Sequence, residues 1–139
     1  MATSGTGYSG IPLVRKLGYK PGSVALLIGA PDDYRTWLAD LPDDITFNAA
    51  PPPGSVDLVH LFSTRLSDLQ EQLAYARSVM KSDGVTWVSW PKKASRVPTD
   101  ITEDVVRRVA LAGDLVDVKV CAVTETWSGL KLMVRKVLR

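Results

Sequence analysis

Four short polar segments carry the side chains that are suited to chemistry, and each follows an apolar stretch of the sequence. In an open parallel sheet, ligands bind beyond the carboxyl ends of the strands, so we expect the four segments to meet at one edge. There the ammonium groups of Lys92 and Lys93 would bind an anionic ligand beside an indole ring. The segments are residues 30–33, Ser63-Thr64-Arg65, Trp90-Pro91-Lys92-Lys93 and residues 124–128. The residues predicted to bind a ligand are Ser63, Thr64, Trp90, Lys92, Lys93, Trp127 and Ser128.

Several of these groups also have a purely structural interpretation. Lys92 and Lys93 fit a solvated basic loop, and Glu125 would make the cluster structural if it paired with either lysine. Trp127 has few apolar neighbours in sequence, which suits a platform for a ligand or partner and equally a lid over the end of the core. The pattern therefore indicates a binding edge without fixing what it binds.

Few groups in the sequence could act as catalysts. His60, the only histidine, lies inside an apolar run, which favours a hydrogen-bonded core residue over a general base. Cys121 alternates within a predicted strand and is expected to pack as a small hydrophobe. Asp32 and Asp33 could supply acid–base chemistry, but acids in the first turn of a helix also stabilise its dipole. With no zinc-ligand spacing, P-loop or dinucleotide glycine pattern, we predict no catalytic residue, no metal and no cofactor.

Length and composition favour one domain. The chain has 139 residues and is 45% hydrophobic, enough for one core without metals or disulfides. Residues 1–10, rich in Gly, Ser and Thr, predict a flexible tail, and residues 11–139 the single domain. Because the N-terminus lacks a signal-peptide pattern and no apolar run could span a membrane, we expect a cytoplasmic protein without membrane contact.

Charge is unevenly divided along the chain. Residues 1–80 carry 6 basic and 8 acidic groups, whereas residues 81–139 carry 11 and 7. Such an imbalance could attract phosphates, but no basic helix or aromatic strand motif accompanies it, so nucleic-acid binding is not expected. Charges on the last strand, at Lys131, Arg135, Lys136 and Arg139, discourage edge pairing and favour a monomer or weak dimer.

Hydrophobic periodicity predicts alternating strands and helices. Apolar runs indicate strands at residues 24–28, 45–48, 56–62 and 85–90, and a pair of alternating strands at 116–123 and 130–135. Helices are predicted between Pro12 and Gly18, after Asp32-Asp33 through Leu41, from residue 66 until Gly84, and from an Asp100/Glu103 capping box to Gly113. This order predicts a three-layer α/β fold with a mostly parallel, Rossmann-like sheet and a C-terminal antiparallel hairpin.

The link between the second and third strands is too short for a helix. Residues 49–55 include Pro51-Pro52-Pro53, and seven residues in polyproline II conformation reach about 22 Å. A strand of about five residues spans about 17 Å, so the prolines allow an extended return to a parallel strand. An antiparallel strand at 45–48 is the alternative.

From Lys20 onward, the chain resembles class I S-adenosylmethionine-dependent methyltransferases. The run from Lys20 to Gly29 resembles their entry into the first strand, and the terminal run from Leu115 to Lys136 resembles their closing antiparallel hairpin. Three further motifs resemble a small bacterial family of unknown function over nearly the full length. These motifs are Gly7-Tyr8-Ser9-Gly10, Trp90-Pro91-Lys92-Lys93 and Glu125-Thr126-Trp127-Ser128-Gly129.

The chain departs from a working methyltransferase where the cofactor would sit. The resemblance implies a Gly-x-Gly-x-Gly loop after the first strand, but here the strand ends Gly29-Ala30-Pro31, and proline removes a backbone donor. The resemblance also implies an acid on the second strand to hold the ribose, and only Asn48 stands there. We therefore expect a degenerate methyltransferase-like domain that acts as a non-catalytic binding or regulatory module, with a protein partner.

One alternative remains open at this point. The fold could keep a reshaped pocket for an anionic small molecule, as a binding protein or an enzyme, including a divergent S-adenosylmethionine-dependent methyltransferase. Lys92, Lys93 and Ser63 or Thr64 would then contact the ligand.

Overall fold

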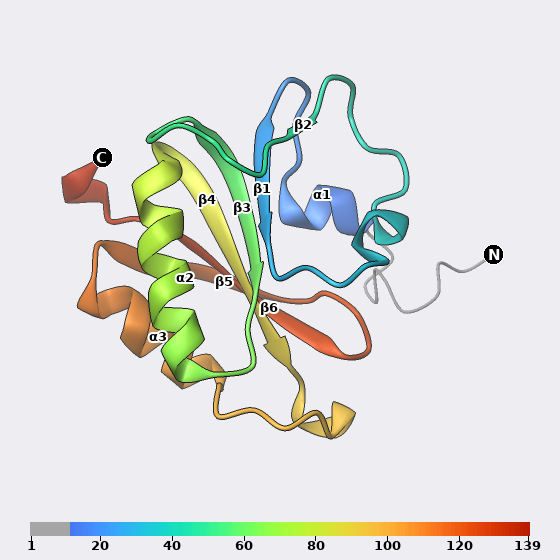
Figure 1. The fold of residues 1–139 in the computed structure, drawn as a ribbon, viewed down its shortest axis with the longest axis vertical. Coiled ribbons are helices and arrows are strands. Elements are labelled where there is room, and N and C mark those ends of the chain that lie inside the picture. Colours follow the sequence, from blue (N-terminus) through green and yellow to red (C-terminus); the bar gives the residue numbers. More distant parts are fainter. Residues whose placement is uncertain (1–11) are drawn as a thin grey trace.

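Six strands form one sheet in the computed structural model, which describes residues 12–139. In the order β2-β1-β3-β4-β6-β5, β1 pairs in parallel with β2 and β3, and β3 with β4, whereas β6 is antiparallel to both neighbours. This arrangement confirms the predicted sheet and its C-terminal hairpin (Figure 1). The bounds are β1 (Val24–Ile28), β2 (Thr46–Phe47), β3 (Val56–Phe62), β4 (Met80–Pro91), β5 (Leu115–Ala122) and β6 (Trp127–Val134).

The strands β2 and β3 both run parallel to β1, so the predicted parallel orientation is confirmed and the antiparallel alternative is wrong. The link through residues 49–55 contains bends at 49–50 and a turn at 53–54. The predicted tail, residues 1–10, and the motif Gly7-Tyr8-Ser9-Gly10 lie outside the described residues. None of the helices in the described part of the chain is both long and apolar enough to cross a membrane.

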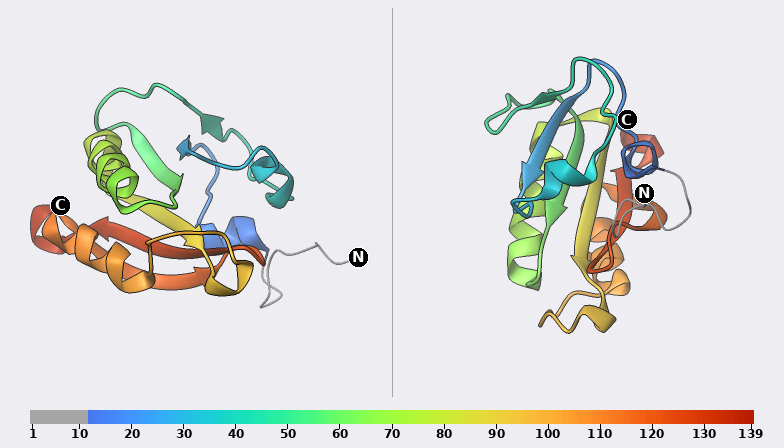
Figure 2. Two further views of the ribbon diagram at one scale, coloured as in Figure 1. Left: turned by 60° about the horizontal axis from the view of Figure 1, so that its bottom comes forward. Right: turned by 90° about the vertical axis from the view of Figure 1, so that its right-hand side faces the viewer.

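Helices cover the two faces of the sheet unequally. α2 (Leu66–Val79) and α3 (Glu103–Ala112) pack on one face, which we call the helical face. The short helix α1 (Leu13–Leu17) and a 3₁₀ turn, η1 (Tyr34–Trp37), pack on the other, the aromatic face. Figure 2 shows α1 and α2 on opposite sides of the strands. Two further 3₁₀ turns are η2 (Lys93–Ser95) and η3 (Lys136–Leu138).

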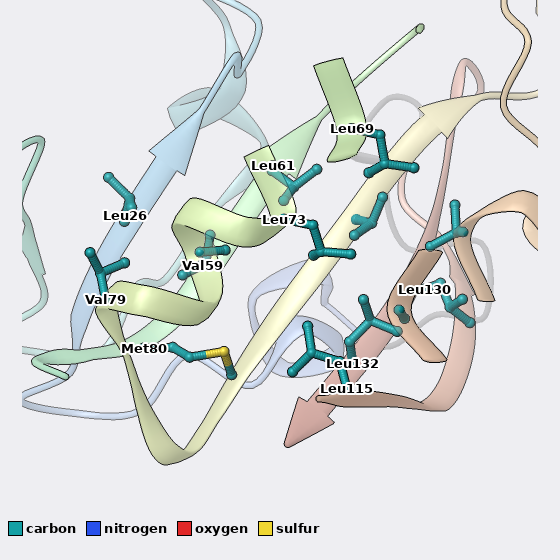
Figure 3. Packing of buried hydrophobic residues seen from close by; sticks show 14 of the residues in the cluster. Leu26, Val59, Leu61, Leu69, Leu73, Val79, Met80, Leu115, Leu130 and Leu132 are labelled. Atoms are coloured by element: carbon teal, nitrogen blue, oxygen red, sulfur yellow. The ribbon is translucent and has the colours of Figure 1, made fainter. Parts of the chain in front are cut away.

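The core under the helical face consists almost entirely of hydrocarbon. Leu69 and Leu73 of α2 belong to the same buried cluster as Leu61 of β3 and Leu130 of β6 (Figure 3). Burial of each such side chain contributes about 1.5–3 kcal/mol, so these contacts hold both helices on the sheet.

The core under the aromatic face contains large rings and polar atoms. Trp87 of β4 is fully buried, and its indole nitrogen donates to the Leu17 carbonyl oxygen at 2.8 Å. This bond ties the C-terminal end of α1 to the centre of the sheet. Glycine is required at position 129 of β6, because a Cβ there would lie 2.9 Å from Val123 Cγ2 and 3.2 Å from the Trp87 ring.

The prediction of a helix from Asp32-Asp33 through Leu41 is wrong, because only the single 3₁₀ turn η1 forms there. Tyr34 turns into the aromatic face and its hydroxyl bonds to the His60 ring, which fixes the chain close to the sheet after one turn. Farther on, Asp40 and Asp44 adopt positive φ values of 60° and 63°, which end any helical path.

Two predicted helix boundaries are also wrong. α2 ends at Val79, and Gly84 lies inside β4, where a Cβ would approach the Val56 carbonyl oxygen to 2.9 Å.

α3 begins at Glu103 with Thr102 as its N-cap, whose hydroxyl accepts from Val105 N. Asp100, predicted to cap this helix, accepts instead from Leu66 N at the start of α2, at 2.7 Å. A carboxylate beside a helix N-terminus satisfies an otherwise unpaired backbone donor, so Asp100 serves the neighbouring helix.

The charges of the last strand suggested that it lies at an edge of the sheet, but the structure places it inside the sheet. β6 lies between β4 and β5, and β5 forms the edge of the sheet. Val118 and Val120 of β5 are each 48% exposed there.

Candidate functional site

A cleft opens at the carboxyl edge of the sheet, on the aromatic face. Its volume is about 400 Å³. One wall is the segment after β1, and the other is the loop between β5 and β6, which Figure 1 shows at the same end of the molecule. The lining residues are Pro31, Asp33, Trp37, Thr124, Glu125, Thr126 and Trp127.

Aromatic rings support the cleft. Phe62, the last residue of β3, is buried and meets Trp127 edge to face, with ring centroids 5.0 Å apart and planes at 89°. Trp37 packs on the same phenyl ring at 6.1 Å and on Tyr34 at 5.4 Å. Both indoles of the cleft therefore rest on one buried ring, which fixes their positions relative to each other.

Hydrogen bonds hold the β5–β6 loop in shape. The Thr124 hydroxyl oxygen accepts from the backbone N–H groups of Thr126 and Trp127, each at 3.1 Å. The backbone N–H of Lys92, the residue that follows β4, donates to the Thr126 carbonyl oxygen at 2.7 Å. The loop wall is thus bonded within itself and to β4 before any ligand arrives.

Two carboxylates lie in the lining. An Asp33 oxygen accepts from the Trp37 indole nitrogen at 3.3 Å, and both Asp33 and Glu125 are exposed. Burial lowers the pKa of Lys92, while the Glu125 carboxylate acts in the opposite direction. The cleft therefore offers negative charge beside aromatic surface, with Lys92 near one of its two acids.

Below the cleft, a chain of buried hydrogen bonds crosses the aromatic face. The Tyr19 and Tyr34 hydroxyls are 2.8 Å apart, Tyr34 meets His60 Nδ1 at 2.8 Å, and His60 Nε2 meets Ser89 Oγ at 2.7 Å. Burial lowers the pKa of His60 to about 3 and raises that of Tyr19 to about 12, so both stay neutral near pH 7. The prediction that His60 is a hydrogen-bonded core residue is confirmed. Cys121 is buried in the same cluster, as predicted.

The structure separates the two tryptophans that the sequence placed together. In the β4–β6 register, Pro91 faces Trp127 and Trp90 faces Ser128. Since paired residues share a face and neighbours alternate, Trp90 lies on the opposite face from Trp127. Trp90 is 6% exposed and belongs to the core of the helical face. Of the seven predicted ligand-binding residues, Trp127 alone lines this cleft.

The predicted hydroxyl and lysine contacts lie outside the cleft. The buried Ser63 hydroxyl donates to the Arg65 carbonyl oxygen at 3.2 Å, and the Thr64 carbonyl oxygen accepts from the Thr99 hydroxyl at 2.7 Å. Both residues thus shape the approach to α2. Lys93 is exposed at the start of η2.

The loop after β1 and the end of β2 are engaged within the protein. Gly29 has a φ of 67°, and a Cβ there would lie 2.9 Å from the Phe62 carbonyl oxygen. Beyond it, Tyr34 N donates to the Pro31 carbonyl oxygen at 3.0 Å. After β2, the Asn48 side-chain oxygen accepts from Ala50 N at 3.0 Å.

A second cavity, of about 500 Å³, lies between α2 and α3 on the helical face. Its lining is mostly apolar and is bounded by the ion pair between Arg77 and Asp114, at 3.1 Å. Within residues 12–139, no group of three or more His, Cys, Asp or Glu side chains is arranged to hold a metal ion.

A protein-family model matches residues 15–136 of this sequence. The chain belongs to the DUF3052 family of proteins of unknown function. This membership agrees with the resemblance drawn from the sequence motifs. No curated protein matches the chain in sequence.

Several solved structures that share this fold at low sequence identity are described as methyltransferases. A structure assigned as a type 11 methyltransferase from Sulfolobus solfataricus is 15% identical, with a TM-score of 0.67 over 96% of this chain and 95% of that one. A SAM-dependent methyltransferase from Aquifex aeolicus is also 15% identical, with a TM-score of 0.63 over 88% and 87%. For 1,6-didemethyltoxoflavin-N1-methyltransferase from Burkholderia thailandensis, the identity is 15% and the TM-score 0.59, over 88% and 76%. The fold of this DUF3052 chain is therefore methyltransferase-like.

Sequence reasoning missed Trp37 as a cleft residue and treated Asp33 mainly as a helix-end charge. Their spacing of four residues looks like one face of a helix. In the 3₁₀ turn, the same spacing brings the Trp37 indole to the Asp33 carboxylate, at the mouth of the cleft.

Proposed function

We propose that this domain is a non-catalytic binding module of the methyltransferase-like fold, and that its cleft takes an organic cation. The observation that carries the proposal is the pairing of two indoles, Trp37 and Trp127, with two carboxylates, Asp33 and Glu125, around one cavity. Indole faces and carboxylates both attract ammonium and guanidinium groups, and aromatic surface favours methylated or flat cations.

The segment after β1 favours a domain that does not transfer methyl groups. Methyltransferase-like folds hold their cofactor with backbone donors of a glycine loop that leads into a helix N-terminus. Here the loop contains Pro31, which has no N–H, and farther on the amides of Tyr34 and Thr36 donate to the carbonyl oxygens of Pro31 and Asp33 in the same turn. A single 3₁₀ turn also lacks the aligned dipole of an α-helix.

The end of β2 supports the same conclusion. A carboxylate at this place accepts hydrogen bonds from the ribose hydroxyls in dinucleotide-binding folds. Asn48 is a neutral amide instead, and its side-chain oxygen accepts from Ala50 N, which holds the local turn. Both places where the cofactor would be bound are thus used for local structure.

Two sources could present the cation, a free amine or a lysine or arginine side chain of a protein. Among the structural neighbours is a complex between the Haloferax volcanii Trm112 methyltransferase activator and a protein assigned as a methyltransferase, with a TM-score of 0.56. A domain of this fold in complex with a protein therefore has a precedent.

The experiment compares choline with its neutral isostere 3,3-dimethylbutanol, followed by tryptophan fluorescence and isothermal titration. We expect choline to bind at least ten times more tightly, because only its charge differs. Trp127→Leu and Asp33→Asn should each weaken choline binding severalfold. A short peptide with one trimethyllysine tests the side-chain source.

Asp32→Asn is the matched control, since Asp32 is the same residue type one position away and does not line the cleft. Equal binding of choline and the alcohol, or equal losses in the two aspartate variants, would overturn the proposal. Tight binding of S-adenosylmethionine would overturn its non-catalytic part.

A further inference from the structure

Lysine side chains gather on the aromatic face, away from the cleft. Lys131 lies in the middle of β6, where its neighbours across the sheet are the buried Trp87 of β4 and Lys119 of β5. Because paired residues share a face, both lysines lie on the side that α1 covers. Lys20, just after α1, is close enough for its charge to act on Lys131. Lys16 of α1 reaches the same hairpin, where its ammonium group donates to the Ala122 carbonyl oxygen at 3.3 Å.

The pairing of Lys119 with Lys131 is set by strand register. Like charges directly opposite each other on antiparallel strands destabilise the pair. Lys119 follows the register shift between residues 117 and 119, so the bulge of β5 itself brings the two lysines face to face. Lys131 is half-buried, which weakens the screening of this repulsion by water.

The ion pairs found in the described residues lie elsewhere. Arg77 pairs with Asp114, and Lys81 pairs with Asp57. Arg107 pairs with Glu103, Asp104 and Asp117. In agreement with this arrangement, burial, Lys119 and Lys20 all lower the pKa of Lys131. Strand register thus places Lys119 opposite Lys131, and Lys20 adds a third positive charge that acts on Lys131.

We propose that Lys20, Lys119 and Lys131 form a binding site for a phosphate group. Three lysines can neutralise a phosphate dianion, and an ammonium group binds phosphate oxygens as a point charge without needing planar geometry. A bound phosphate would also relieve the repulsion across β5 and β6. The phosphate could belong to a free phosphorylated molecule or to a nucleic-acid strand, which share this chemistry.

The test measures the unfolding temperature and the binding of pyrophosphate at constant ionic strength, with chloride as the reference salt. We expect pyrophosphate to raise the unfolding temperature of the natural chain and to bind it saturably. Lys119→Gln and Lys131→Gln should each weaken pyrophosphate binding at least tenfold. The same two variants should unfold at a higher temperature than the natural chain in low-salt chloride, because the repulsion is gone.

Lys136→Gln serves as the control, because it removes an exposed lysine of η3 outside the cluster. A parallel titration with a single-stranded oligonucleotide distinguishes the two sources of phosphate: binding that exceeds that of pyrophosphate and depends on the same lysines assigns the site to a strand. The proposal is overturned if neither ligand distinguishes the Lys119 and Lys131 variants from the control. It is also overturned if these variants are less stable than the natural chain in chloride.

Discussion

The two faces of the sheet are built from different chemistry. The helical face buries leucine and valine under two helices and carries most of the ion pairs of the described residues. Within residues 12–139, the aromatic face is covered by the short helix α1 and the turn η1, and it buries tryptophan, tyrosine and histidine linked by hydrogen bonds. The cleft and the lysine cluster both lie on the aromatic face. The helical face thus buries few polar groups, whereas the aromatic face buries a hydrogen-bonded polar network, whose members are costly to leave without partners.

Trp87→Ala should have the largest effect on stability. It removes the largest fully buried side chain and the bond to Leu17 that holds α1, so we expect a loss of about 3–5 kcal/mol. Leu69→Ala on the helical face should cost about 2–5 kcal/mol but leave α1 protected. Denaturant unfolding with hydrogen exchange of the α1 amides tests the difference. Equal exchange of α1 in both variants would contradict the role given to Trp87.

Acid should destabilise the protein through the aromatic face. The pKa of His60 is about 3 when folded, against an ordinary value of 6.5, so the unfolded chain binds a proton that the folded chain does not. The stability contributed by neutral His60 is therefore complete above pH 6.5 and declines as the pH falls, by up to about 1.4 kcal/mol per unit. Urea unfolding between pH 7.5 and 5 measures this slope. His60→Gln should flatten it, and an unchanged slope in that variant would assign the effect to other groups.

Tyr34→Phe should have a smaller effect, about 1–3 kcal/mol, because it removes the hydrogen-bond partner of His60 Nδ1 and of the Tyr19 hydroxyl, while His60 Nε2 keeps its bond to Ser89. The triple variant Tyr34→Phe, His60→Leu, Ser89→Ala should recover part of this loss, since it removes both partners of each central bond. Thermal unfolding compares the two. A triple variant that loses the sum of its single effects would show that the hydrogen bonds act independently.

Asp114→Asn should have the smallest effect. It breaks the partly exposed pair with Arg77 on the helical face, and exposed pairs contribute about 0–1 kcal/mol. Unfolding in low salt and in 0.5 M NaCl tests this expectation, because salt should remove the small difference. A loss above about 2 kcal/mol would mean that this ion pair, rather than hydrocarbon packing, holds the end of α2.

The sequence predicted the sheet well because its strands are local apolar runs. Residues 24–28 and 56–62 were bounded correctly, as was α1, since turn residues flank each element. The cleft was predicted only in part, because its geometry depends on long-range pairing. Nothing local in Trp90 or Trp127 reveals the β4–β6 register that places them on opposite faces. The turn η1 was missed for a similar reason, since the bond from Tyr34 to His60 joins residues 26 positions apart.

The proposal that most needs a test is that the cleft between Trp37 and Trp127 binds the ligand of this domain, while the segment after β1 binds no cofactor. It is tested most directly by amide and indole chemical shifts in ¹H–¹⁵N spectra, recorded with choline and separately with S-adenosylhomocysteine. We expect choline to shift Asp33 and the Trp37 and Trp127 indole signals, and S-adenosylhomocysteine to leave Gly29 and Asn48 unchanged. Saturable shifts of Gly29 and Asn48 with S-adenosylhomocysteine, and none in the cleft with choline, would contradict the claim.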